Sequence, residues 1–488
     1  MSGTSSTPAD RGEPGGPLLP PGFRFGVATA GFQVEGGYNG PGDPANNWLA
    51  WERAGRVEPS GIALDFWRRA EEQLDKVAAL GCDTFRLSVE WARVEPAPGE
   101  LDEAALARYR QILLACTERG LTPVVTLHHF THPAWLGEEF WLDPAAPERF
   151  AEWAEAAVAR LGEHCRHWVT LNEPNVVAFG SYLLGLFPPG CRDLRAALVA
   201  LDHLLAGHLL ACRRIRRRQP EAWVTTNTAA ASVHEVDRLG LDLLLADPAD
   251  LDPGRFPDWQ AAARATWDAL VPPPDPVDRW FRRLVRRRFE VPLRSGLSAT
   301  LAARRQDPEL RALDAVGVDY YNPYLSRHLR LPGQPTAGGR SWSISRPLWD
   351  DVVDPAGLLV FCRAAAATGL PVWIVENGLA SRVRRGRAFP RLDGWDRPRY
   401  LRAMLGAVLA GLAEGLPIEA YLHWTLADNY EWGSYEPRFG LFGVDRERGL
   451  RWSEHDSLGQ DAAGTYARII AGLRAGDASV VDRLAQAR

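Results

Sequence analysis

Residues 168–174 read Trp-Val-Thr-Leu-Asn-Glu-Pro, and residues 372–378 read Val-Trp-Ile-Val-Glu-Asn-Gly. Each stretch begins with four residues that are mostly apolar or β-branched, and a carboxylate follows within one or two positions. Short apolar runs of this kind are typical of strands that are buried on both faces of a parallel sheet. Parallel α/β folds place their ligands at the carboxyl ends of such strands. The two stretches therefore predict buried strands that end in a functional site.

The same apolar pattern recurs along the chain and predicts eight strands, which are Phe25–Ala28, Thr84–Leu87, Pro123–Leu127, Trp168–Leu171, Trp223–Thr226, Ala315–Tyr320, Val372–Val375 and Ile418–Trp424. Amphipathic patterns between them predict helices at Phe66–Leu80, Glu103–Arg119, Pro147–Leu161, Leu194–Arg217, Pro355–Thr368 and Pro398–Glu414. Regular alternation of strands and helices indicates an α/β fold with a parallel sheet. Eight such units predict one (β/α)8 TIM barrel.

The expected domain organisation is a single barrel with a tail at each end. Residues 1–20 are rich in Ser, Thr, Gly and Pro and are predicted to form a flexible N-terminal tail. Residues 21–473 are predicted to form the catalytic barrel, and residues 474–488 a C-terminal tail. Asp247–Pro276 and Leu331–Asp351 are dense in turn-forming residues and are expected to be long βα loops.

Composition excludes several classes of protein. The formal net charge of -5 on 488 residues gives no electrostatic case for nucleic acid or an anionic membrane. No uninterrupted apolar run approaches the ~20 residues that span a bilayer. The beginning of the chain does not resemble a secretory signal, and the six scattered cysteines form no C-x-x-C pair. These features favour a cytoplasmic protein, in which arginine clusters such as Arg213–Arg218 are solvated helix faces rather than phosphate or partner sites.

Glu173 and Glu376 are the candidate catalytic pair, because they follow the fourth and the seventh predicted strands. Strands four and seven lie on opposite arcs of a barrel, so both carboxylates project into one central funnel. Two facing carboxyl groups can cleave an acetal, since one protonates the leaving oxygen while the other attacks or activates water. A separation of ~5–5.5 Å predicts retention of configuration, and ~6.5–9.5 Å predicts inversion.

Tryptophan supports a carbohydrate ligand. The chain has 19 tryptophans, and Trp424 and Trp432 lie beside the polar residues Asp428, Asn429 and Glu431. Indole rings stack on the apolar faces of sugars, while polar side chains bind the hydroxyl groups. Most single tryptophans are core or surface filler, but these two adjoin candidate site residues.

Together these motifs resemble glycoside hydrolase family 1, the β-glucosidase family, from about Gly22 to Leu473. The resemblance is carried by Phe25–Ala30 with Gln33 and Glu35, by Phe85–Trp91, Leu127–Phe130 and Thr170–Pro174, and by Ile374–Gly378, Trp424, Asn429–Trp432 and Arg438–Leu441. It implies a retaining β-glycosidase that works by double displacement, without a metal or another cofactor. The implied substrate is a small-molecule or oligosaccharide β-glycoside.

The resemblance also implies a role for each matching residue. Glu376 would be the nucleophile, and Glu173 would be the acid/base. Arg86 and Tyr321 would hold Glu376 ionised and oriented. The residues that would bind the sugar are Gln33, His129, Asn172, Trp424, Glu431 and Trp432, with Trp424 as the stacking floor and Asn172 at the 2-hydroxyl.

The chain departs from the family pattern at three places. Val375 stands where the family usually has Thr, and Asp319 where it usually has Asn. The loop 433–437 is one residue shorter than the common form. An ionised Asp319 would raise the proton affinity of the nearby carboxylates and move the pH optimum upward. Glu431 would repel a phosphate, so unphosphorylated glucosides and galactosides are the expected substrates, with glucose preferred.

Alternatives stay open at the level of the sequence. A transglycosylase would use the same glycosyl-enzyme, with an acceptor hydroxyl in place of water. A catalytically weak barrel that only binds glycosides is a second alternative. His128, His129 and His132 cluster at the end of the third strand and could indicate a metal site. The oligomeric state and the natural aglycone are not indicated.

Overall fold

The computed structural model describes residues 18–252, 254–293, 297–324, 326 and 352–484. Eight parallel strands close into a barrel in the order β1-β10-β7-β6-β5-β4-β3-β2. The strands are β1 (Arg24–Ala28), β2 (Thr84–Ser88), β3 (Thr122–Thr126), β4 (His167–Asn172), β5 (Trp223–Ala229), β6 (Val316–Tyr320), β7 (Val372–Asn377) and β10 (Ile418–Trp424). Every predicted strand matches one of them, so the (β/α)8 barrel is confirmed.

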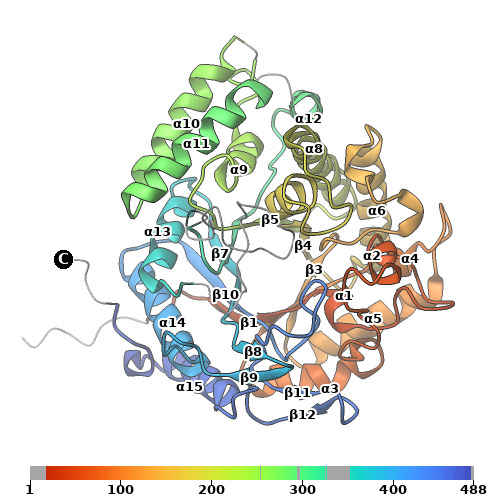
Figure 1. Ribbon diagram of the computed structural model, residues 1–488, viewed down its shortest axis with the longest axis vertical. Coiled ribbons are helices and arrows are strands. Elements are labelled where there is room, and N and C mark those ends of the chain that lie inside the picture. Colours follow the sequence, from red (N-terminus) through yellow and green to blue (C-terminus); the bar gives the residue numbers. More distant parts are fainter. Residues whose placement is uncertain (1–17, 253, 294–296, 325, 327–351, 485–488) are drawn as a thin grey trace, which may run out of the picture.

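Helices form a ring around the strands (Figure 1). The longer helices are α3 (Phe66–Ala79), α5 (Glu103–Glu118), α6 (Ala146–Leu161), α8 (Leu194–Arg218), α10 (Phe256–Leu270), α11 (Pro276–Leu293), α13 (Pro355–Ala366), α14 (Arg397–Ala413) and α15 (Ala462–Arg474). Shorter helical segments are α1 (Gly31–Val34), α2 (Leu49–Arg53), α4 (Trp91–Val94), α7 (Pro174–Val176), α9 (Arg238–Leu245) and α12 (Ser298–Gln306). Asp102, Asp193 and Asp354 cap α5, α8 and α13 by accepting hydrogen bonds from the first-turn N–H groups.

Side chains fill the interior of the barrel, as expected for eight strands. Val124, Val169, Trp373 and Leu422 from four different strands belong to one buried cluster. Val375 belongs to it as well, and the pairing of β6 with β7 shifts register at this point. The extra residue at the shift makes Glu376, rather than Val375, the partner of Asp319 across the two strands. The packing of Val375 in the interior and the register shift of β7 therefore both determine the orientation of Glu376.

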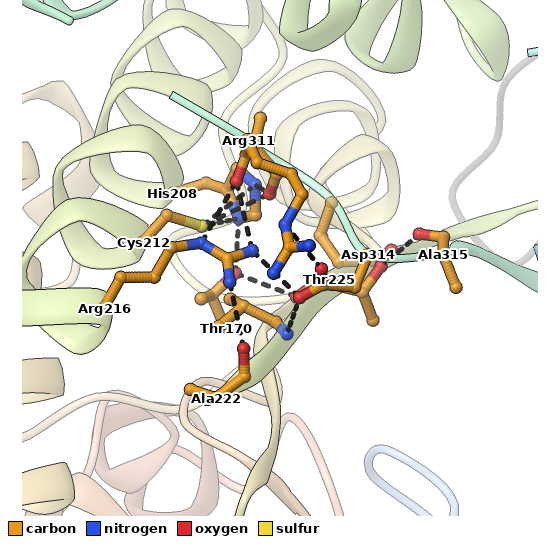
Figure 2. A network of polar contacts seen from close by, with 12 residues as sticks. Thr170, His208, Cys212, Arg216, Ala222, Thr225, Arg311, Asp314 and Ala315 are labelled. Carbon is orange, nitrogen blue, oxygen red and sulfur yellow. Dashed lines mark hydrogen bonds and ion pairs between the residues drawn. The ribbon is translucent and has the colours of Figure 1, made fainter. Parts of the chain in front are cut away.

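A polar network ties α8 to the barrel wall (Figure 2). His208 on α8 donates from Nε2 to the Ala312 carbonyl oxygen at 2.9 Å, and its Nδ1 faces the Thr170 hydroxyl of β4 at 2.6 Å. About two turns later, Arg216 forms an ion pair with Asp314 at 2.9 Å. The His208 contacts satisfy buried polar groups, and the ion pair of Arg216 joins partly buried ones, where α8 packs on β4 and on the segment before β6.

Among the described helices, α8 alone has the length and apolar composition of a membrane span. Buried residues make up 67% of its apolar window, and it packs against α6 and α12. A core helix of a large barrel has these same properties.

The expected loop Asp247–Pro276 contains the helix α10, which occupies half of it. The ion pair of Arg286 with Asp268 joins α10 to α11 at 2.5 Å. Leu331–Asp351 lies outside the described residues. Leu18 and Leu19 pack partly against the core, although residues 1–20 were expected to be a tail.

The described part of the expected C-terminal tail also packs on the barrel. Residues Ala478–Val480 form a short 3-10 helix, and Val481 is buried. Apolar contact therefore extends the folded barrel to residue 484 within the described chain.

Candidate active site

Three carboxyl groups converge at the carboxyl ends of the barrel strands. Glu173 follows β4, Asp319 lies in β6 and Glu376 lies in β7. One oxygen of each lies within 4.8 Å of an oxygen of the other two. All three side chains are buried. Among the described residues, this is also the one group of three His, Cys, Asp or Glu side chains with possible metal-ligand atoms this close together.

The backbone at Glu173 is in the left-handed region, with φ 41° and ψ 63°. Pro174 follows, and a proline disfavours the helical conformation for the residue before it. The Glu173 N–H donates to the Asn227 carbonyl oxygen of β5 at 3.0 Å, which holds this conformation. A residue other than glycine with positive φ is strained, and such strain gathers at functional sites. Here it turns the carboxyl group into the barrel mouth.

Two donors orient Glu376. Arg86 Nη1 lies 2.5 Å from Oε1, and the Tyr321 hydroxyl donates to Oε2 at 2.9 Å. Burial raises the pKa of Glu376, while the Arg86 charge and both hydrogen bonds lower it. These contacts stabilise the carboxylate form. The structure thus brings together the three residues whose association the sequence predicted.

Arg86 also reaches the residue beside the second carboxyl group. Its Nη2 donates to Asn172 Oδ1 at 2.5 Å, and its Nε donates to Thr126 Oγ1 at 3.0 Å. Asn172 Oδ1 also accepts from Asn227 Nδ2 at 2.7 Å. Because its carbonyl oxygen is fully used, Asn172 can offer only its NH2 group to a ligand.

Glu173 and Asp319 both have a pKa well above the ordinary range of a carboxyl group. Burial is the largest cause for each, and the Glu376 charge is the second. Arg86 lowers both pKa values but is already paired with Glu376. The site therefore favours an ionised Glu376 beside a protonated group.

The sugar-binding candidates lie around the ends of β1, β3 and β10. Gln33 Nε2 donates to Glu431 Oε2 at 3.1 Å, and Trp424 Nε1 donates to Glu431 Oε1 at 3.2 Å. The His129 ring stacks on Trp432 at 5.5 Å between centroids. His129 also lies 5.9 Å from Trp424 between ring centroids, so contacts link all five of these predicted residues.

Burial also shifts the pKa values of Glu431 and His129. Burial raises the pKa of Glu431 to about 8, against the hydrogen bonds from Trp424 and Gln33. Burial holds the pKa of His129 well below its usual value, so the ring is neutral. A neutral imidazole can both donate and accept hydrogen bonds to hydroxyl groups.

The histidine metal alternative is not supported by the geometry. His128 Nε2 accepts from Trp141 Nε1 at 3.3 Å, and His132 Nε2 contacts the Gly137 carbonyl oxygen at 2.9 Å. His129 instead packs beside the rings of Trp424 and Trp432. The three rings serve different local contacts and do not converge on one point.

Sequence reasoning missed Asn227. Its Nδ2 donates to both Asn172 and Asp319, so it joins β4, β5 and β6 beneath the carboxyl groups. Asn227 is the polar residue at the end of the fifth predicted strand. The rule that found the other strand-end residues would have found it too.

The chain matches the family described as Glycosyl hydrolase family 1 over residues 17–247 and 311–469. β-Glucosidase A of Thermotoga maritima is 26% identical over 475 residues, which cover 93% of this chain and 97% of that protein. Beta-glucosidase 4 of Oryza sativa subsp. japonica is 27% identical and covers 91% and 96%.

Solved structures show the same fold. A T. maritima β-glucosidase in complex with deoxynojirimycin has a TM-score of 0.70 at 24% identity, covering 93% of this chain and 99% of that one. The AHE enzyme from Alicyclobacillus herbarius has a TM-score of 0.70 at 26% identity, covering 93% and 98%. The family match spans well over half of the chain and includes Glu173 and Glu376. The chain belongs to glycosyl hydrolase family 1 and is a glycoside hydrolase.

Proposed function

We propose that this chain is a retaining β-glycosidase that hydrolyses unphosphorylated β-D-glucosides and β-D-galactosides. The observation that carries the proposal is the separation of Glu173 and Glu376, whose nearest candidate oxygens lie within 4.8 Å. Carboxyl groups about 5–5.5 Å apart leave no room for a water between them and favour double displacement. The β-glucosidase names of the relatives support the same substrate class.

In the first step, Glu376 attacks the anomeric carbon while the glycosidic bond breaks. Arg86 and Tyr321 hold the attacking carboxylate in position through hydrogen bonds of 2.5 and 2.9 Å. Glu173 gives its proton to the departing oxygen, so the aglycone leaves as a neutral alcohol. The product is a glycosyl ester on Glu376 and an ionised Glu173.

In the second step, Glu173 takes a proton from water as the water oxygen attacks the anomeric carbon. The bond to Glu376 breaks and its carboxylate is restored. Two inversions at the same carbon give net retention. Asn172 can donate its NH2 group to the 2-hydroxyl, because Arg86 and Asn227 occupy its carbonyl oxygen.

The sugar-binding side supports a neutral sugar. Gln33 and Glu431 form one hydrogen-bonded pair. Gln33 and Trp424 donate hydrogen bonds to Glu431, and among the described residues no arginine or lysine contacts it that could anchor a 6-phosphate. Glucose and galactose differ only at the 4-hydroxyl that this pair would contact. We propose that both are accepted and that glucose is preferred.

The test follows hydrolysis of an aryl β-glucoside by wild type, Glu173→Gln and Glu376→Gly, with the product anomer observed by NMR. Azide is added to the Glu376→Gly reaction as an external nucleophile. Retained β-configuration in wild type, loss of activity in both variants and formation of an α-glucosyl azide by Glu376→Gly with azide support the assignments. Glu447→Gln, an exposed residue on a turn, is the matched control and should behave as wild type.

Two outcomes would contradict the proposal. An α-glucose first product would mean inversion, and activity that survives the loss of Glu376 would remove its role. Products in which the sugar is transferred to an added alcohol in preference to water would identify a transglycosylase with the same glycosyl-enzyme. Binding of glucoside without turnover would identify a glycoside-binding barrel.

A further inference from the structure

Asp319 adds a third carboxyl group to a site whose double displacement needs only two. It lies in β6, between β5 and β7. The side chains that shift the pKa of Asp319 are Glu173 from the end of β4, Glu376 from β7, Arg86 from β2 and Asn227 from β5. Tyr321, which follows β6, is the other titratable neighbour, and the Asp319 charge raises the pKa of its hydroxyl.

The charges around Asp319 do not balance if all three carboxyl groups ionise. Among these groups Arg86 is the one cation, and its Nη1 and Nη2 are engaged by Glu376 and Asn172. Full ionisation would place three negative charges against one positive charge in a buried site. Carboxylates this close cannot all ionise near neutral pH, so at least one proton is retained.

The hydrogen bonds show where that proton can reside. Asn227 Nδ2 donates to Asp319 Oδ2, whereas Oδ1 is buried and has no donor among the described residues. Asn172 Nδ2 approaches Glu173 Oε2 at 3.4 Å, which is a long contact. One oxygen of Asp319 lies within 4.8 Å of an oxygen of Glu173. Two carboxyl groups this close can be bridged by a hydrogen bond only when one of them carries a proton.

We propose that Asp319 and Glu173 share a single proton, and that Asp319 is a positioning residue that keeps the acid/base protonated into the alkaline range. This inference rests on the proposed function, because it assigns a proton to the same site. The raised pKa values of both residues, caused first by burial and then by the Glu376 charge, agree with it.

The shared proton is consistent with both chemical steps. As the glycosidic bond breaks and Glu376 bonds to the anomeric carbon, the proton passes from Glu173 to the leaving oxygen. The pair then carries two negative charges while Glu376 is a neutral ester, so the charge of the three groups is unchanged. Two adjacent carboxylates are a stronger base than one, and they recover a proton from the attacking water as the ester bond breaks.

The test is the pH dependence of kcat/KM on an aryl β-glucoside for wild type and Asp319→Asn. Glu173 acts as an acid only when protonated, and in a pair that shares one proton the loss of that proton leaves two adjacent negative charges, which raises the pKa for this loss. Removing the Asp319 charge lowers the pKa, so the basic limb of the profile should move down by at least about one pH unit. Asp445→Asn, at an exposed carboxylate paired with Arg448 at 3.6 Å, is the matched control and should leave both limbs in place.

The outcomes separate this inference from the proposed function. Wild type without activity on aryl β-glycosides would overturn the proposed function. An active wild type whose basic limb coincides with that of Asp319→Asn would overturn proton sharing alone. A wild-type profile altered by EDTA would overturn it too, because the three carboxyl groups would then hold a cation.

If circular dichroism shows that Asp319→Asn does not fold, the basic limb of the wild-type kcat/KM profile tests proton sharing instead. A basic limb above pH ~7.5 would support proton sharing, since the second proton of a close carboxyl pair is lost at raised pH. A basic limb at or below that pH would overturn it.

Discussion

At the scale of single residues, Arg86 has the most consequences for the chemistry. Its side chain is fully buried, and its guanidinium group bonds the nucleophile candidate and Asn172 through different nitrogens. A planar fork with fixed donors can do this, whereas the ammonium group of lysine is a point charge. Charge and geometry can therefore be separated by two substitutions at this position.

Arg86→Met should lower kcat/KM by roughly 10²–10³-fold, the usual cost of losing one preorganised donor to a reacting group. The acidic limb of the pH profile of kcat/KM should also move to higher pH. Arg86 lowers the pKa of Glu376, which must be ionised to attack, so its loss raises the pH below which activity fails. Arg86→Lys keeps the charge and should lower kcat/KM with a much smaller shift of the limb. An acidic limb at the same pH in wild type and Arg86→Met would contradict this account.

Glu431→Gln tests recognition of the 4-hydroxyl. Removing a carboxylate that bonds a sugar hydroxyl should lower kcat/KM for aryl glucosides by about 10²-fold or more, because a buried polar contact is lost. The penalty should shrink at least tenfold for the 4-deoxyglucoside, which has no 4-hydroxyl to lose. A penalty of equal size on both substrates would mean that Glu431 acts on another part of the sugar.

At the scale of elements, the ends of β7 and β10 approach each other at Gly378. A Cβ atom at this position would collide with the Trp424 carbonyl oxygen and lie 3.2 Å from Phe439 Cδ1. Both obstacles are parts of the site wall, since Trp424 and Phe439 share the interior cluster. Only glycine lets the end of β7 approach the end of β10 this closely.

Gly378→Ala should therefore separate these strand ends and lower kcat/KM by about 10-fold or more, while the barrel remains folded. The checks are steady-state kinetics and a thermal melt. Gly254→Ala, where a Cβ atom meets nothing within 4 Å, is the matched control. Wild-type kinetics in Gly378→Ala would show that the spacing of β7 and β10 does not position Glu376.

The α8 network of Figure 2 predicts a dependence of stability on pH. Burial lowers the pKa of His208 to about 4. The unfolded chain takes up a proton near pH 6.5 and the folded chain only near pH 4, so the stabilisation is complete above pH 6.5 and is lost as the pH falls toward 4. The shift amounts to about 3 kcal/mol.

His208→Gln should lower the free energy of unfolding at pH 7 and should narrow its difference from wild type between pH 6.5 and 4. Urea melts at several pH values measure both quantities. A difference that stays constant over this range would mean that His208 is not buried in its neutral form.

The elements themselves could be predicted from the sequence because their signals are local. Apolar runs such as Trp168–Leu171 and capping aspartates such as Asp102 fix strands and helix starts within a few residues. α10 was missed because Pro and Asp flank it and its apolar face is weak in sequence. The strand-end rule located Glu173 and Glu376 at the carboxyl ends of β4 and β7, where the structure has them. No sequence pattern reports the left-handed backbone at Glu173 or the hydrogen bonds of Asn227 to two neighbours.

At the scale of the whole molecule, closure of the barrel creates the site. Glu173 and Glu376 are far apart in the chain, and they meet because β4 and β7 belong to one closed sheet. The segment that the family match omits, 248–310, contains α10, α11 and α12, which lie at the outer edge of the barrel in Figure 1. Glu173, Asp319 and Glu376 therefore all lie within the part of the chain that matches the family.

The measurement that tests the central claim most directly is covalent trapping with an aryl 2-deoxy-2-fluoro-β-glucoside that has a good leaving group. Fluorine at carbon 2 slows both steps, and the leaving group restores the first, so the glycosyl-enzyme accumulates. We expect one added fluoroglucosyl group per chain, located by peptide mass spectrometry on Glu376. A label on Glu173, Asp319 or any other residue, or inactivation without a label, would contradict the account.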